Sequence, residues 1–109
     1  MLDKLKKRRT QYALGKNLPI SDTQVDALIR EAIRLSPSSF NSQSSRAVIL
    51  FGRESDKFWS IAKEALQAIV PAADFAATAK KIDGFASGAG TVLFYEDQEP
   101  VKALQANFP

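Results

Sequence analysis

The chain has 109 residues, room for one domain, and its 45% hydrophobic and 25% charged content is typical of folded globular proteins. It contains no cysteine and no histidine, which excludes disulfides, thiolate metal sites and imidazole as general base or metal ligand. No apolar run approaches the ~20 residues of a membrane span and the first residues lack an apolar signal core, so we expect a cytoplasmic protein that does not contact a membrane.

Positive charge is concentrated at the N-terminus. The net charge is +3, and residues 1–9 carry five basic side chains against one acidic side chain. A short helix is predicted over 3–9, and its three lysines fit a solvated helix face. Arg8, Arg9 and Thr10 suit a phosphate, because two planar guanidinium groups and a hydroxyl offer converging donors. A nucleic-acid surface would interleave aromatic residues with these charges, and none is present, so we expect no nucleic-acid partner.

The next helix is marked by signals at both of its ends. Gly15 and Pro19 predict a connecting loop over 13–20, and Ser21 with Gln24 predicts a capping box. The helix should end before Pro37, because a residue preceding proline avoids the helical region. Its apolar residues recur at helical spacing and define one buried face: Val25, Leu28, Ile29, Ala32 and Ile33.

A polar segment, residues 36–43, links this helix to the first predicted strand. It reads Ser-Pro-Ser-Ser-Phe-Asn-Ser-Gln and offers hydrogen-bond donors and acceptors with almost no charge. That chemistry suits a flat ligand rich in heteroatoms, such as a flavin or a nucleobase. The alternative is an ordinary polar connection, since Ser, Asn and Pro are common loop residues.

The rest of the chain alternates strands and helices. Continuously apolar runs at 46–51 and 91–95 predict two strands that are buried on both faces. Between them, Ser55 is the predicted cap of a helix that Pro71 interrupts, and residues 72–87 continue at helical spacing. A last helix is expected over 99–107. Four aromatic residues recur at helical spacing in these helices, and we expect them to belong to the core: Phe58, Trp59, Phe75 and Phe85. We expect Glu96 and Asp97 to be structural.

Several motifs together resemble the FMN-dependent nitroreductase family, and nearest its short subfamily with the yeast fatty-acid-repression-type proteins. They are Arg-Arg-Thr-x-Tyr at 8–12, Ser-Pro-Ser-x-x-Asn-x-Gln at 36–43 and Gly-Thr-Val-Leu-Phe-Tyr-Glu-Asp at 90–97. Family members are about twice this long. The resemblance therefore implies that residues 1–109 are the N-terminal half of a single nitroreductase-like domain. The implied fold is α+β, a mixed α/β layered fold that is incomplete, with two core strands and flanking helices.

The resemblance also implies a set of FMN contacts. Residues matching the first motif contact the FMN phosphate, ribityl chain and ring edge in the family; here these are Arg8, Arg9 and Thr10. Tyr12 is included with them, although many relatives have a basic residue there. Residues matching the second motif lie along the isoalloxazine ring of the opposite subunit; here these are Pro37, Ser38, Ser39, Asn41 and Gln43. Many relatives continue with Pro-Trp, where this chain has Ser44-Ser45. No catalytic side chain and no metal ligand is assigned.

The implied function is an FMN-dependent NAD(P)H oxidoreductase that reduces nitroaromatic or quinone-type acceptors by ping-pong hydride transfer, as a homodimer. Such a protein needs no histidine or cysteine, because the flavin carries the chemistry. Arg8 or Arg9 is the candidate donor toward flavin N1 and O2. The alternative is a truncated, non-catalytic fragment or interaction module with weak or no FMN binding. Apolar surface around Val48 and Leu93 would stay uncovered in a half-domain, which predicts self-association.

Overall fold

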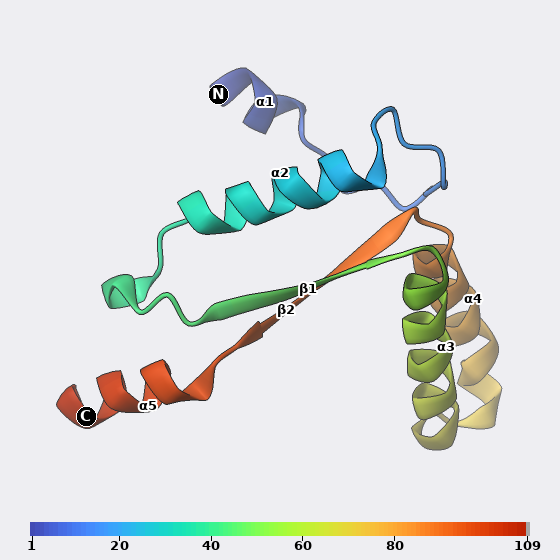
Figure 1. The fold of residues 1–109 in the computed structure, drawn as a ribbon. Helices are drawn as coiled ribbons and strands as arrows, with labels where there is room; N and C mark the ends of the chain where they lie inside the picture. The colour runs from blue at the N-terminus through green and yellow to red at the C-terminus, as the bar shows by residue number, and fades with distance from the viewer. Residues whose placement is uncertain (109) are drawn as a thin grey trace. The chain divides into compact units, whose positions relative to one another are not determined.

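The computed structural model describes residues 1–108, which form two compact units (Figure 1). One unit contains residues 1–17 and 52–89, and the other contains residues 18–51 and 90–108. Each unit is therefore built from two separate stretches of the chain. Helices and a small sheet occur together, which confirms the α+β class.

The sheet belongs to the second unit and has two antiparallel strands, β1 (Ser45–Phe51) and β2 (Gly90–Glu96). The register runs from the pair Ser45↔Glu96 to the pair Phe51↔Gly90. Gly90 is required at its position, because a Cβ atom there would lie 2.7 Å from the carbonyl oxygen of Leu50. Both predicted strands are confirmed, each slightly longer than expected.

Helix α2 (Asp22–Leu35) also belongs to the second unit, and its predicted capping box is confirmed. The Ser21 Oγ accepts from the Gln24 backbone N–H at 3.2 Å, and the Gln24 side chain accepts from the Ser21 N–H at 3.0 Å. The helix gives way to extended backbone at Ser36, one residue before the proline. The predicted buried face is only partly buried, since Leu28 is 61% exposed.

Two short elements complete this unit. A single turn, η1 (Ser39–Asn41), lies within the polar segment. Helix α5 (Gln98–Asn107) follows β2 directly and is capped by Asp97, whose Oδ1 accepts from the Glu99 N–H at 3.1 Å. The predicted last helix is therefore confirmed.

The first unit is helical and contains α1 (Leu2–Lys7), α3 (Gly52–Ile69) and α4 (Ala72–Ala86). α3 and α4 lie side by side (Figure 1) and are joined through the ring of Trp59, which packs against Phe58 and Phe85 at centroid distances of 4.9 and 5.4 Å. These three rings pack together as expected of a core, although each is only half-buried. An ion pair between Lys63 and Asp83, at 2.9 Å, also joins the two helices.

Three predictions about helix boundaries and faces in this unit were wrong. α1 ends at Lys7 and not at Arg9, because Arg8 is already extended (ψ of 133°). α3 begins at Gly52, whose φ of 51° turns the strand straight into the helix. Ser55 is therefore no cap but a first-turn residue, 2% exposed. The helical spacing of the apolar residues after Ser55 predicts that Ile69 faces inward, but Ile69 is 77% exposed.

The prediction that both strands are buried on two faces was also wrong for the described residues. Val48 is 41% exposed and Phe94 is 67% exposed, while Leu93 is half-buried. Within residues 1–108, Ile82 is the only buried apolar side chain. No helix in this range combines the length and apolar composition of a membrane span.

Candidate functional site

The polar loop, residues 36–43, has an unusual backbone. Phe40, Asn41 and Gln43 all have positive φ, at 53°, 52° and 51°. This left-handed region costs a non-glycine residue about 1–2 kcal/mol, and asparagine tolerates it best. Such residues persist only where the surrounding structure fixes them, so the contacts around this loop determine what it can bind.

Ser38 organises the loop from within. Its carbonyl accepts from the Asn41 N–H at 3.0 Å, and its Oγ accepts from the Gln43 N–H at 3.0 Å. The hydroxyl thus bridges the first and last parts of the loop. Ser38 is half-buried, whereas Phe40, Asn41 and Gln43 are exposed.

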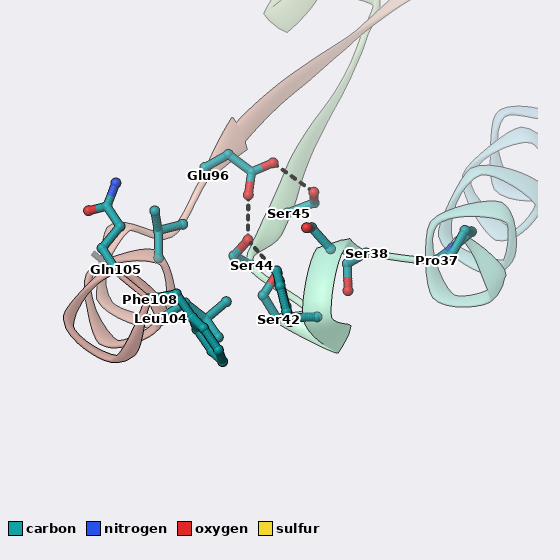
Figure 2. A pocket seen from close by; sticks show the side chains of 12 residues that line it. Pro37, Ser38, Ser42, Ser44, Ser45, Glu96, Leu104, Gln105 and Phe108 are labelled. Atoms are coloured by element: carbon teal, nitrogen blue, oxygen red, sulfur yellow. Dashed lines mark hydrogen bonds between the residues drawn. The ribbon is translucent and has the colours of Figure 1, made fainter.

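The loop exit is bonded to two acidic residues at the end of β2, Glu96 and Asp97, here called the acidic step. One Glu96 oxygen accepts from Ser44 Oγ at 2.6 Å and the other from Ser45 Oγ at 2.8 Å, as Figure 2 shows. Ser42 Oγ lies 3.2 Å from Ser44 Oγ and extends this network into the loop. Ser44 is 5% exposed, so it is well shielded from competing water.

These hydrogen bonds affect the protonation of Glu96. They come first from Ser44 and then from Ser45, and with the charge of Arg46 they hold the pKa of Glu96 below its ordinary value of 4.5, against a smaller opposing effect of desolvation. Glu96 is therefore a carboxylate that accepts two hydroxyl donors throughout the neutral range.

Arg46 joins the acidic step to the loop backbone. Its Nη1 donates to the Gln43 carbonyl at 2.8 Å, and its Nη2 donates to Asp97 Oδ2 at 3.1 Å. The Asp97 N–H in turn donates to the Ser44 carbonyl at 2.8 Å. Both residues of the acidic step therefore hold the stretch from Gln43 to Ser45.

Two cavities border the polar loop. The first, about 720 Å³, lies between α2, the loop and β2. Apolar side chains such as Ile29, Ile33 and Phe94 line it, together with the loop residues Asn41 and Gln43. Its volume falls in the usual range of small-molecule sites. Its lining, apolar walls with a few polar groups, is also typical of such sites.

The second cavity, about 620 Å³, lies between the loop and α5. Phe40 and Phe108 stack at its edge, with ring centroids 5.1 Å apart and planes inclined by 22°. Glu96 and Leu104 also line it, and Figure 2 shows Leu104, from α5, beside Phe108, which directly follows that helix. Pro37 and Ser38 line both cavities.

The structure brings one set of predicted site residues together. These five all belong to the polar loop: Pro37, Ser38, Ser39, Asn41 and Gln43. Within residues 1–108 the side-chain amides of Asn41 and Gln43 have no hydrogen-bond partner in the protein, so both are available to a ligand.

The other predicted set lies in the first unit, in the extended stretch after α1. Arg9 Nη1 donates to the carbonyls of Lys6, at 2.9 Å, and Arg8, at 2.7 Å. The Arg8 guanidinium makes no such bond within the described residues. Thr10 and Tyr12 are exposed. The two sets occupy different units, and their contact with one shared ligand stays a prediction.

The chain matches the model of the nitroreductase family over residues 5–108. It belongs to that family. Two proteins of Saccharomyces cerevisiae are similar along 99% of this chain: HBN1, 34% identical over 110 residues, and the nitroreductase FRM2, 31% identical over 111 residues. The resemblance to the short yeast-type subfamily is confirmed.

A solved structure shows the same fold. Nitroreductase CinD from Lactococcus lactis, in complex with chloramphenicol, is 44% identical and superposes with a TM-score of 0.81 over 98% of this chain. The chain covers 53% of CinD and 54% of each yeast relative. It thus spans about half the length of the nitroreductases it matches.

Sequence reasoning found the polar loop of this nitroreductase chain but missed what holds the loop. Glu96 and Asp97 were expected to be structural, but their partners were not identified. The signal that could have revealed their role was the hydroxyl pair Ser44-Ser45 at the exit of the loop. Both hydroxyls become donors to the Glu96 carboxylate once the register sets Ser45 against Glu96.

Proposed function

We propose that this chain supplies the N-terminal half of an FMN-dependent NAD(P)H oxidoreductase that reduces nitroaromatic or quinone-type acceptors by ping-pong hydride transfer. The observation that carries the proposal is the family match, which spans almost every described residue. CinD supports the acceptor class, since it has been solved with chloramphenicol and with 4-nitrophenol, both nitroaromatic compounds.

The donor set of the polar loop fits a flavin ring. An isoalloxazine presents alternating carbonyl oxygens and ring nitrogens on a flat system. The Asn41 and Gln43 amides each supply both donors and acceptors, and they line a cavity with apolar walls. The flavin, when bound, would accept a hydride from the nicotinamide and deliver it to the acceptor. The side chains of this loop would orient the ring, and none needs to transfer a proton.

The basic segment fits the phosphate end of the same cofactor. We propose Arg8, Arg9 and Thr10 as phosphate, ribityl or ring-edge contacts, with Tyr12 beside them. Arg8 is the better candidate for a cofactor contact, because part of the Arg9 guanidinium already donates to carbonyls of its own segment. A guanidinium directed at flavin N1 and O2 would stabilise negative charge on the reduced ring.

A homodimer is the proposed assembly, with the polar loop of one subunit contacting the cofactor that the basic segment of the other holds. Exposed apolar side chains in the second unit support it: Leu28 at 61%, Val48 at 41% and Phe94 at 67%. Burying such surface contributes about 25 cal/mol per Å². Sedimentation of the purified chain tests the assembly, and a monodisperse monomer would contradict it. The cytoplasmic location stays a prediction.

The function is tested by titrating the purified protein with FMN, following the fluorescence of the flavin, and then supplying NAD(P)H and a quinone. We expect bound FMN and acceptor-dependent oxidation of NAD(P)H. Bound FMN without turnover would favour the non-catalytic module. No binding of FMN would contradict the proposal for this chain.

A further inference from the structure

The acidic step sits where it can control the polar loop. The loop backbone is held in a left-handed conformation at Phe40, Asn41 and Gln43, which unrestrained non-glycine residues leave readily. Its own bonds, from Ser38, close it from within. At its exit, side chains donate hydrogen bonds to two residues that are distant in sequence: Ser44 and Ser45 donate to Glu96. Arg46 donates to Asp97.

Glu96 has two features that suit it to this role. Each of its two oxygens accepts from a different serine, at 2.6 and 2.8 Å, so the carboxylate joins two successive residues of the exit. Ser44 continues to Ser42 at 3.2 Å, one residue before Gln43. Strand pairing places Ser45 opposite Glu96, so the bonds form without distorting the sheet.

We propose that Glu96 is a positioning residue, which acts through Ser44 and Ser45 to keep the polar loop in the conformation that presents Asn41 and Gln43 to a ligand. Arg46 assists by holding the Gln43 carbonyl while it is paired with Asp97. In this proposal, Ser44 and Ser45 are the hydroxyl donors that connect the Glu96 carboxylate to the loop. The identity of the ligand as FMN depends on the proposed function, whereas the order of the loop does not.

The test compares Glu96→Ala with Glu64→Ala in the full chain. Glu64 is exposed on α3 and makes no hydrogen bond or ion pair within the described residues, so the control removes the same side chain and charge. Backbone ¹⁵N order parameters of Asn41 and Gln43, measured without FMN, should fall from about 0.85 to below about 0.6 in Glu96→Ala and stay unchanged in Glu64→Ala. Equal values in the two variants would overturn the proposal.

A milder variant covers the case in which Glu96→Ala does not fold. Ser45→Ala removes one of the two bonds and should lower the same order parameters by a smaller amount. Where Glu96→Ala does fold, a double-mutant cycle is a second test: Glu96→Ala should lower the order parameters less in the Ser45→Ala background than alone, because the two residues act together. Additive effects, or no effect of Ser45→Ala, would contradict the proposal.

FMN binding supplies the functional readout. If the competent loop population falls to about one tenth, the Kd for FMN rises about ten-fold, and Glu64→Ala should leave it unchanged. A mobile loop with an unchanged Kd would refute the positioning role. If the unsubstituted chain takes up no FMN at all, the proposed function fails, while the order parameters still decide whether Glu96 fixes the loop.

Discussion

Alanine at position 90 tests the close approach of the two strands. A Cβ atom on Gly90 would lie 2.7 Å from the Leu50 carbonyl oxygen and 3.1 Å from Phe51 Cδ1. The oxygen belongs to the backbone of the paired strand, so it cannot move aside as a flexible side chain can. Overpacking of this kind typically costs about 1–3 kcal/mol. We therefore expect Gly90→Ala to lower the free energy of unfolding of the sheet by an amount in this range.

Gly84→Ala is the matched control. Gly84 lies inside α4, and a Cβ atom there would meet nothing within 4 Å. Replacing glycine by alanine in a helix interior stabilises by about 0.5–1 kcal/mol. The same chemical change should therefore act with opposite sign at the two positions, because only one of them faces a neighbouring backbone.

The two effects can be read separately. Trp59, the single tryptophan, reports on the α3–α4 pair, and amide hydrogen exchange of β1 and β2 reports on the sheet. Gly84→Ala should raise the urea midpoint of the tryptophan signal, and Gly90→Ala should lower protection of the strand amides. If Gly90→Ala left that protection unchanged, the reasoning from the strand contact would be refuted.

Three further changes give distinct results. Ser21→Ala should lower the stability of α2 by about 1 kcal/mol, through loss of the capping box, and unaltered urea unfolding would argue against the cap. Because the pKa of Glu96 is lowered by folding, the contribution of its carboxylate to stability is present above the ordinary pKa near 4.5 and is lost as pH falls below it. Glu96→Gln should therefore make the urea midpoint less dependent on pH in that acid range. An unchanged dependence on pH would contradict the direction of the pKa shift. Arg8→Gln should weaken FMN binding about ten-fold or more, since a charge-assisted bond is lost, whereas Arg53→Gln, an equal loss of charge at an exposed residue of α3, should not; equal effects would indicate general electrostatics.

Elements with local signals were predictable from the sequence. The capping box at Ser21 and the proline at 37 fixed both ends of α2, and continuous apolar runs marked both strands. The start of α3 was not predictable in this way. Ser55 is a common capping residue, but the chain turns already at Gly52, because glycine adopts the positive φ that joins strand to helix. Burial of the strands was overestimated because an apolar run does not say whether something covers it.

In the candidate site, too, the features with a local signal were predictable. The polar loop and the Arg-Arg-Thr segment each have a distinctive composition within a few residues, so both were found. The partners of the loop lie about fifty positions further along the chain, and only the antiparallel register brings Glu96 opposite Ser45. A serine pair and an acidic pair are each unremarkable alone. Their relation is a property of strand pairing, which single-sequence patterns do not contain.

The pairing of Phe51 with Gly90 has a consequence for how this region can vary. Residues 52–89 leave the sheet and return to it at directly opposed positions, about 5 Å apart, so they amount to one long excursion from a two-stranded hairpin. A tight two-residue turn could in principle close the same gap with the register intact. Length changes within this excursion should consequently be tolerated far better than the insertion of a single residue in either strand, which would exchange the two faces of the sheet.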